Sequence, residues 1–265
     1  MNLRHLVSLI VISAAPASGW SAPVFVPVRA VLEDVPDKRP DVEKLCEQLK
    51  THVAKGGAED QDAVAVVDKL LTEYKNSGPK DRAAIVAALS KNFEAKRREN
   101  EAGVRDNRIY RASAVAMGEM GSDATKSLVK WIGAKDHKKD IPVQSDLIHA
   151  LGKTKDKAAV PELIGLLEHK DAPLVGAAAD ALGEFAESDL ETRKKGFEGM
   201  LKVLMSAKGA TDSNLNDGIA RERYDTIASP IITSLTRLSK HEERAPDEWQ
   251  RWWNKNKGKN WDEEK

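Results

Sequence analysis

Apolar residues recur along most of the chain at the three- and four-residue spacing of amphipathic helices. Glycine, proline and aspartate interrupt this pattern at short intervals, as helix ends and turns do. No stretch alternates apolar and polar residues for long enough to indicate a strand, so we predict an all-α fold. Two of the helical series are Val42, Leu45, Leu49, Val53 and Ile85, Ala88, Leu89, Phe93.

The middle of the chain repeats one helix motif. Its copies are RASAVAMG at 111–118, DLIHALG at 146–152 and AAADALG at 177–183, and each is followed by a second apolar helical pattern. Their final glycines, Gly118, Gly152 and Gly183, lie 34 and 31 residues apart. A period of this length indicates helix pairs that bury their apolar faces by stacking on one another. The small residues of the motif would let neighbouring helices approach closely.

The motif AxxALG, followed after a turn by AVPELIGLL at 159–167, resembles HEAT repeats, particularly the short variety also found in phycobilisome lyases. Residues 108–205 carry the resemblance well, and residues 41–96 and 226–253 carry it loosely. It implies an α-solenoid of HEAT-like helix pairs over residues 41–244. Two segments break the repeat. Residues 96–108 are strongly charged and are either a polar helix or a loop, and residues 206–223 are predicted to be an inserted polar loop.

The N-terminus has the pattern of a signal peptide. Arg4 precedes an apolar stretch, residues 6–15, that is too short to span a bilayer, and small residues follow it. We therefore predict a signal peptide at 1–22 and a mature chain that is exported to the periplasm or the extracellular space, without a transmembrane segment. Residues 23–40 contain four prolines and are predicted to form an extended leader.

The C-terminal segment, residues 245–265, is predicted to be a tryptophan-rich helix and tail. Trp249, Trp252 and Trp253 share one face of a helix that begins at Pro246. The ending resembles the closing segment of exported bacterial HEAT proteins. Its tryptophans either cap the open end of the solenoid by burial or form an exposed aromatic anchor for a partner.

Charge and composition narrow the function. Lysine and arginine number 42, as do aspartate and glutamate, so there is no basic excess of the kind that nucleic-acid binding requires. Cys46 is the only cysteine and lies beside Leu45 and Leu49, where we predict an unreactive, buried thiol. The histidines lack the spacing of metal ligands, and no motif of a nucleophile, phosphate loop or dinucleotide site is present. We expect no catalytic residues, metal or cofactor.

The sequence thus favours a monomeric, non-enzymatic scaffold that presents a concave helical surface to another protein. An accessory lyase or small-molecule-binding protein that uses the same groove is one alternative. Carbohydrate or cell-wall binding through exposed tryptophans is the other. The positions beside the core stripe of the aligned helices are the candidate partner-binding residues: Arg111, Val115, Ile148, His149 and Asp180.

Overall fold

The computed structural model describes residues 37–99 and 105–263. These residues form eleven α-helices and three 3-10 helices, and their one β-type contact is an isolated bridge between Glu99 and Arg105. The all-α prediction is therefore confirmed. The predicted signal peptide at 1–22 and the leader up to residue 36 lie outside the described residues.

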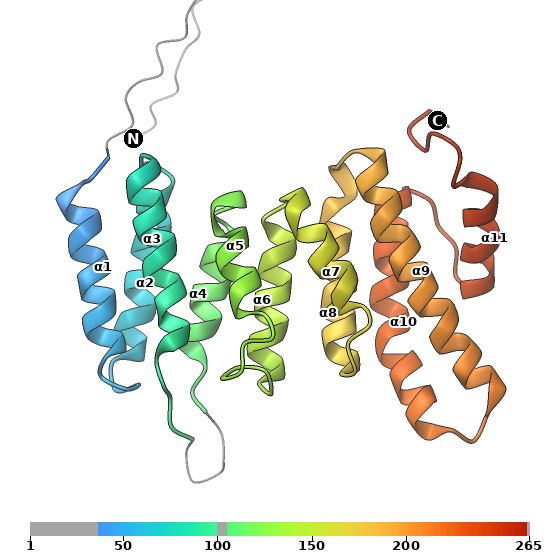
Figure 1. The fold of residues 1–265 in the computed structure, drawn as a ribbon, viewed down its shortest axis with the longest axis horizontal. Coiled ribbons are helices and arrows are strands. Elements are labelled where there is room, and N and C mark those ends of the chain that lie inside the picture. The colour runs from blue at the N-terminus through green and yellow to red at the C-terminus, as the bar shows by residue number, and fades with distance from the viewer. Residues whose placement is uncertain (1–36, 100–104, 264–265) are drawn as a thin grey trace, which may run out of the picture. The chain divides into compact units, whose positions relative to one another are not determined.

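Figure 1 shows the helices following one another in two layers. The even-numbered helices α2, α4, α6, α8 and α10 form one layer, in which each helix packs against the next. The odd-numbered helices form the other layer. None of the described helices is both long enough and apolar enough to cross a bilayer. The α-helices are α1 (Pro40–Val53), α2 (Asp60–Tyr74), α3 (Pro79–Lys91), α4 (Arg108–Gly118), α5 (Ser122–Trp131), α6 (Ile141–Lys153), α7 (Val160–Leu166), α8 (Ala172–Gly183), α9 (Leu190–Ser213), α10 (Gly218–Ser239) and α11 (Pro246–Asn256), and the 3-10 helices are η1 (Asn92–Glu94), η2 (Lys157–Ala159) and η3 (Glu184–Glu187).

Proline and aspartate set where many of the helices begin. Proline occupies one of the first two positions of α1, α3, α6, α7, α8 and α11, where its missing N–H removes no intrahelical hydrogen bond. The carboxylates of Asp140, Asp189 and Asp217 accept a backbone N–H in the first turn of α6, α9 and α10. The prolines and aspartates that interrupt the apolar pattern of the sequence therefore mark the starts of helices.

The repeated glycines bring the even-numbered helices close together. A methyl group placed on Gly118 would lie 3.0 Å from the Cα atom of Ala150, and one on Gly152 would lie 2.6 Å from the Cα atom of Ala181. The distance at Gly152 is shorter than real contacts of a Cβ atom and the one at Gly118 is tighter than most of them, so the absence of a side chain lets these helices pack closely. The motif aligned in the sequence is therefore the contact surface between successive pairs.

The prediction of a polar loop at 206–223 is wrong. Helix α9 continues to Ser213, α10 begins at Gly218, and only residues 214–217 connect them. The two helices form a long hairpin, and from residue 208 to residue 226 none of its side chains is buried. This outer part of the hairpin carries Leu215 and Ile219, which are 68% and 82% exposed.

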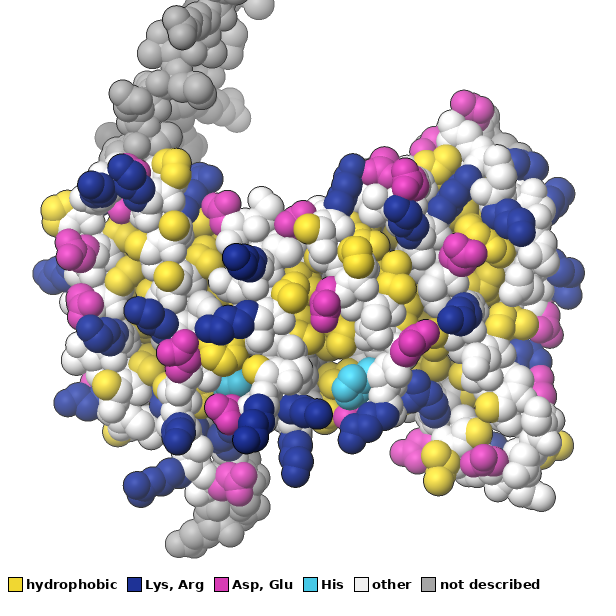
Figure 2. All heavy atoms as spheres, in the orientation of Figure 1, with side chains coloured by type: hydrophobic (Ala, Val, Ile, Leu, Met, Phe, Trp, Pro, Cys, Tyr) yellow, Lys and Arg dark blue, Asp and Glu magenta, His cyan; other side chains and the backbone are white. Residues whose placement is uncertain are grey.

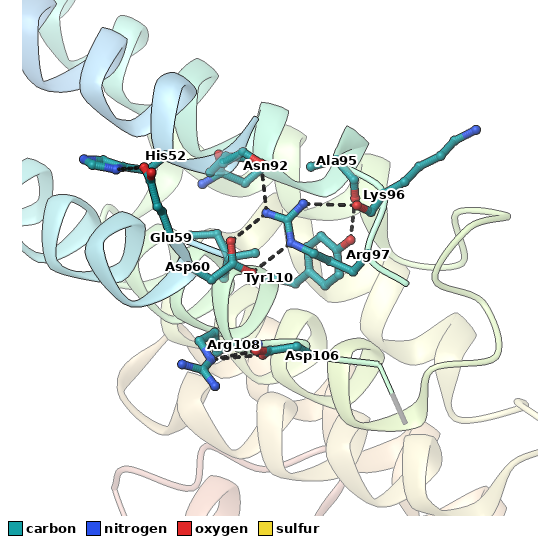
Figure 3. A network of polar contacts seen from close by, with 12 residues as sticks. His52, Glu59, Asp60, Asn92, Ala95, Lys96, Arg97, Asp106, Arg108 and Tyr110 are labelled. Atoms are coloured by element: carbon teal, nitrogen blue, oxygen red, sulfur yellow. Dashed lines mark hydrogen bonds and ion pairs between the residues drawn. The ribbon is translucent and has the colours of Figure 1, made fainter. Parts of the chain in front are cut away.

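Of the charged segment 96–108, the described residues 96–99 and 105–107 form no helix, and a buried ion pair holds its first part to the body of the fold (Figure 3). Arg97 donates two hydrogen bonds of 2.8 Å to the carboxylate of Asp60 in the first turn of α2, and both side chains are almost fully buried. The same guanidinium donates to the carbonyl oxygen of Val53 at the end of α1. Arg97 therefore links three elements that are distant in sequence.

The C-terminal helix closes the end of the stack. Phe197 of α9 is fully buried, and the rings of Trp249, Trp252, Trp253 and Trp261 surround it with centroid distances of 5.1–5.7 Å. Arg193 of α9 is also buried and forms a 2.7 Å ion pair with Asp262. The segment 245–263 thus covers α9 with aromatic surface.

Candidate functional site

The outer surface of the even-numbered helices is the candidate interaction surface. Four of the five predicted partner-binding residues are accessible there: Arg111, Val115 and His149 are exposed, and Asp180 is half-buried. Val115 is 49% exposed and adds apolar surface to this layer. These four residues come from α4, α6 and α8, so consecutive repeats contribute to one surface.

The fifth predicted residue, Ile148, is wrong as a contact residue because its side chain is fully buried. Helix α6 lies between α4 and α8 and also packs against α5. Its buried arc is consequently wide and includes Val143, Leu147 and Leu151 as well as Ile148. Only a narrow stripe that contains His149 and Lys153 stays exposed.

A depression of about 330 Å³ lies on this surface over α2, α4 and α6. Its apolar lining comes from Leu71, Ala112, Val115 and Ala116. Charged side chains border it, and no odd-numbered helix contributes a residue. An apolar centre with a charged border is the arrangement of a small protein-contact site. The charged lining residues are Asp68, Arg108, Arg111 and Asp146.

Ion pairs join neighbouring repeats beside the depression. The Nε atom of Arg111 on α4 lies 2.5 Å from a carboxylate oxygen of Asp146 on α6, and Lys153 of α6 lies 3.2 Å from Glu119 after α4. Three of these side chains are at least half exposed and Asp146 is partly exposed, so each pair contributes at most about 1 kcal/mol to stability. Their main effect is to fix the positions of charges across the surface.

Asp180, on the same surface, has a carboxyl group with a raised pKa. Burial raises the pKa of its carboxyl, the neighbouring His149 and Arg237 lower it, and Glu184 raises it; the net direction is upward. Arg237 itself is bound to Glu184, with 2.8 Å between the charged atoms. The carboxylate of Asp180 is therefore partly desolvated and forms no ion pair with a described residue.

The tryptophan cluster is not an exposed anchor. Trp249 and Trp253 are buried in the contact with Phe197, and Trp252 stacks on the imidazole of His241 with 5.1 Å between centroids and 13° between planes. Stacking on a sugar ring requires a free indole face. The carbohydrate-binding alternative therefore loses the exposed aromatic surface on which it depends.

Within residues 37–99 and 105–263, no group of three or more histidine, cysteine, aspartate or glutamate side chains is arranged to hold a metal ion. The histidines are dispersed over the fold. His137, for example, is buried beside Phe93, Tyr110 and Trp131, and one ring nitrogen lies 2.7 Å from the carbonyl oxygen of Phe93.

Two features of the surface were missed by sequence reasoning. One is the exposed pair Leu215 and Ile219, which lies in the segment interpreted as a polar loop. The other is a groove between α1 and α3, where the thiol of Cys46 is half-buried and not fully buried as predicted. The exposed alanines of α3 are the only signal that could have indicated the groove, and small residues in a solenoid are ordinarily interpreted as close contacts.

The architecture described above is that of an all-α solenoid of HEAT-like helix pairs. Residues 135–194, which run from just before α6 into α9, match the family profile of HEAT repeats. This match and the paired helices together support a HEAT-repeat protein. No curated protein matches the chain. HEAT repeats are in general scaffolds for protein interaction, a role consistent with the surface of the even-numbered helices.

Proposed function

We propose that the chain is an exported, non-enzymatic scaffold that binds another protein through the surface of its even-numbered helices. The observation that carries the proposal is the exposure of Val115 inside the depression over α2, α4 and α6. An isolated exposed valine is unremarkable, but here three further apolar residues adjoin it and charges surround them. When a partner covers the apolar centre of such a surface, the free energy of the complex is lowered, because apolar area is removed from water.

The arrangement favours a macromolecular partner over a small substrate. The depression is shallow and crosses three helices, and its charged groups Arg111 and Asp146 already bind each other. A partner segment with its own apolar residue could cover Val115 while its polar groups meet the fixed charges. That this surface is concave stays a prediction from the repeat geometry.

Export is proposed from the N-terminal sequence pattern, which lies outside the described residues. Expression of the full-length chain with a C-terminal tag, followed by cell fractionation and N-terminal sequencing, tests it. We expect a mature N-terminus close to residue 23 in an exported fraction. An intact Met1 in the cytosol would overturn this part of the proposal.

Crosslinking of the tagged chain in its native envelope fraction, followed by mass spectrometry, tests the binding role. We expect a dominant protein partner with the native chain and its loss with Val115→Asp. The matched control is Ile219→Asp, which places the same charge on another exposed aliphatic residue, far from the depression. Circular dichroism verifies that both variants stay helical.

Loss of the partner with both variants, or with neither, would show that the depression is not the binding surface. The same crosslinking experiment with Arg111→Glu separates the contribution of charge to binding from that of shape. If Arg111 contacts the partner, this variant weakens binding in a salt-dependent way, whereas Val115→Asp weakens it at every ionic strength.

A further inference from the structure

A pocket of about 400 Å³, here called the α3/α5 pocket, lies at the edge of the stack where α3 and α5 begin. Figure 2 shows hydrophobic, cationic and acidic side chains along this edge. The volume falls within the range of small-molecule sites, roughly 300–1,000 Å³. The lining residues are Ser77 and Gly78 of the turn before α3, Pro79, Arg82 and Ala83 of α3, and Asp123 of α5.

Arg82 supplies an unpaired cation to this pocket. Its guanidinium lies over the ring of Tyr74, with 5.1 Å between Cζ and the ring centroid, and this contact with the aromatic face fixes its position. Its Nε atom is buried without a hydrogen-bond partner, and the guanidinium forms no ion pair with any described residue. Removing a guanidinium from water costs free energy that here no counter-charge of the described chain offsets.

The position of Arg82 in its helix does not explain its presence either. It lies close to the start of α3, where a positive charge opposes the helix dipole. An acidic residue would stabilise α3 better at this end. The cation is therefore placed against the preference of its own helix, which favours a role in binding.

Asp123 supplies the opposite charge. One oxygen of its carboxylate accepts a hydrogen bond of 2.6 Å from the hydroxyl of Tyr74, and the carboxylate forms no ion pair with any described residue. Burial and this hydrogen bond raise the pKa of Tyr74, so the phenol stays protonated and donates at neutral pH. Tyr74 therefore positions both charges, Arg82 through its ring face and Asp123 through its hydroxyl.

Two opposite charges that line one pocket without binding each other fit a ligand that carries both charges itself. A simple anion would be repelled by Asp123, and a simple cation would be repelled by Arg82. An α-amino acid has an ammonium group and a carboxylate on the same carbon atom, so it can meet both residues at once. The guanidinium suits the carboxylate in particular, because it can donate two parallel hydrogen bonds to it.

We propose that the α3/α5 pocket binds an α-amino acid with an apolar side chain. The carboxylate of the ligand binds Arg82, and its ammonium group binds Asp123. Its side chain lies against Pro79 and Ala83, which are exposed and give the pocket an apolar wall. The pocket shares no lining residue with the depression around Val115, so the proposal does not depend on the scaffold function.

Isothermal titration calorimetry of the purified full-length chain with L-leucine tests the proposal. N-acetyl-L-leucine lacks the ammonium group and L-leucinamide lacks the carboxylate, so the two derivatives test each charge separately. We expect saturable binding of leucine with a stoichiometry near one, and binding of either derivative that is at least about tenfold weaker. Absence of saturable leucine binding would overturn the proposal. Equal affinity for either derivative would overturn it as well, because the pocket would then recognise a single charge.

Arg82→Gln and Asp123→Asn test whether leucine binds in this pocket. Each substitution removes one charge and keeps most of the side chain, and each should weaken leucine binding by about tenfold or more. The matched control is Lys126→Gln, because Lys126 is an exposed charged residue of α5 that does not line the pocket. Circular dichroism verifies that the variants stay helical. Leucine binding that survives Arg82→Gln in a helical chain, or that is lost equally with Lys126→Gln, would show that the pocket is not the binding site.

Discussion

The indole ring of Trp253 stacks on the phenyl ring of Phe197, with 5.1 Å between the centroids and 21° between the planes. Phe197 belongs to α9, and Trp253 to α11. Through this contact the last helix of the chain covers the last pair of the solenoid. The stack ends in aromatic surface that is shielded from water, as a repeat array requires at its end.

Removal of the central ring should therefore detach the cap. We expect Phe197→Ala to lower the free energy of unfolding by about 3–5 kcal/mol, since a fully buried aromatic ring is lost and four indoles lose their common contact. Urea unfolding followed by circular dichroism measures the change. Val115→Ala is the control and should change stability by less than about 0.5 kcal/mol. Equal effects of the two substitutions would contradict the cap.

Tryptophan fluorescence should show that the indole rings are buried. Trp131, Trp249, Trp253 and Trp261 are buried, and Trp252 is covered by His241. We expect a blue-shifted emission maximum that iodide quenches poorly, followed by a red shift and strong quenching after unfolding. Strong quenching of the folded chain would place the indoles in solvent and revive the anchor hypothesis.

The close approach of α6 and α8 makes a strong prediction for Gly152. A Cβ atom there would lie 2.6 Å from the backbone of α8, so we expect Gly152→Ala to cost about 1–3 kcal/mol of stability through overpacking. Gly209 lies in α9 with no heavy atom within 4 Å of an added Cβ. Gly209→Ala should stabilise the protein by about 0.5–1 kcal/mol. Thermal unfolding of the two variants gives opposite shifts if the helices pack as described.

Removing only one partner of the ion pair between Arg97 and Asp60 should lower the free energy of unfolding strongly. We expect Arg97→Met to lower stability by about 3–5 kcal/mol, because it leaves the carboxylate of Asp60 buried and unpaired. Adding Asp60→Leu should recover much of the loss. Urea unfolding of the single and double variants forms a mutant cycle, and a simple sum of the two single losses would show that the groups do not interact.

The raised pKa of Asp180 predicts a pH effect. A carboxyl whose pKa is higher in the folded chain stabilises the fold below its unfolded pKa of 3.8, and this contribution is lost as pH rises through the folded pKa. Asp180→Asn should therefore raise stability at pH 7 relative to the native chain and reduce the gain on acidification. Urea midpoints at pH 7 and pH 4 measure the difference between the two chains. A variant less stable than the native chain at pH 7 would contradict the desolvation of this carboxyl.

The repeat period and the all-α fold could be predicted because they depend on local patterns. The glycines at 118 and 152 lie at contacts between neighbouring helices. Because the same contact recurs from pair to pair, it requires small residues at a regular spacing, which can be recognised in the sequence. Arg111 and Val115 were placed on the surface for the same reason. Their exposure depends only on the position of each residue around its own helix.

Other features depend on which helices surround a residue. Ile148 was assigned to the surface because its own helix has an exposed face nearby, but helices on several sides bury it. Asn214, Asn216 and Gly218 are turn-forming residues, yet the turn occupies only residues 214–217 and Asp217 starts the next helix at once. Ala84 resembles the contact alanines of the repeat, although it faces an open groove.

The outer hairpin of α9 and α10 has a consequence for how the chain can be altered. No side chain between residues 208 and 226 is buried, and the contacts to the body of the fold come from its two ends, where Lys208 pairs with Asp247 and Arg223 donates to the carbonyl oxygens of His169 and Lys170. The rest of the fold therefore depends little on residues 209–222. The connection between Asn214 and Asp217 is thus a point where the polypeptide can be cut or extended without disturbing the stack. A fluorescent protein or a photo-crosslinking tag inserted there would project from the solenoid, and the two halves of a chain cleaved there would stay joined through the buried parts of the same two helices.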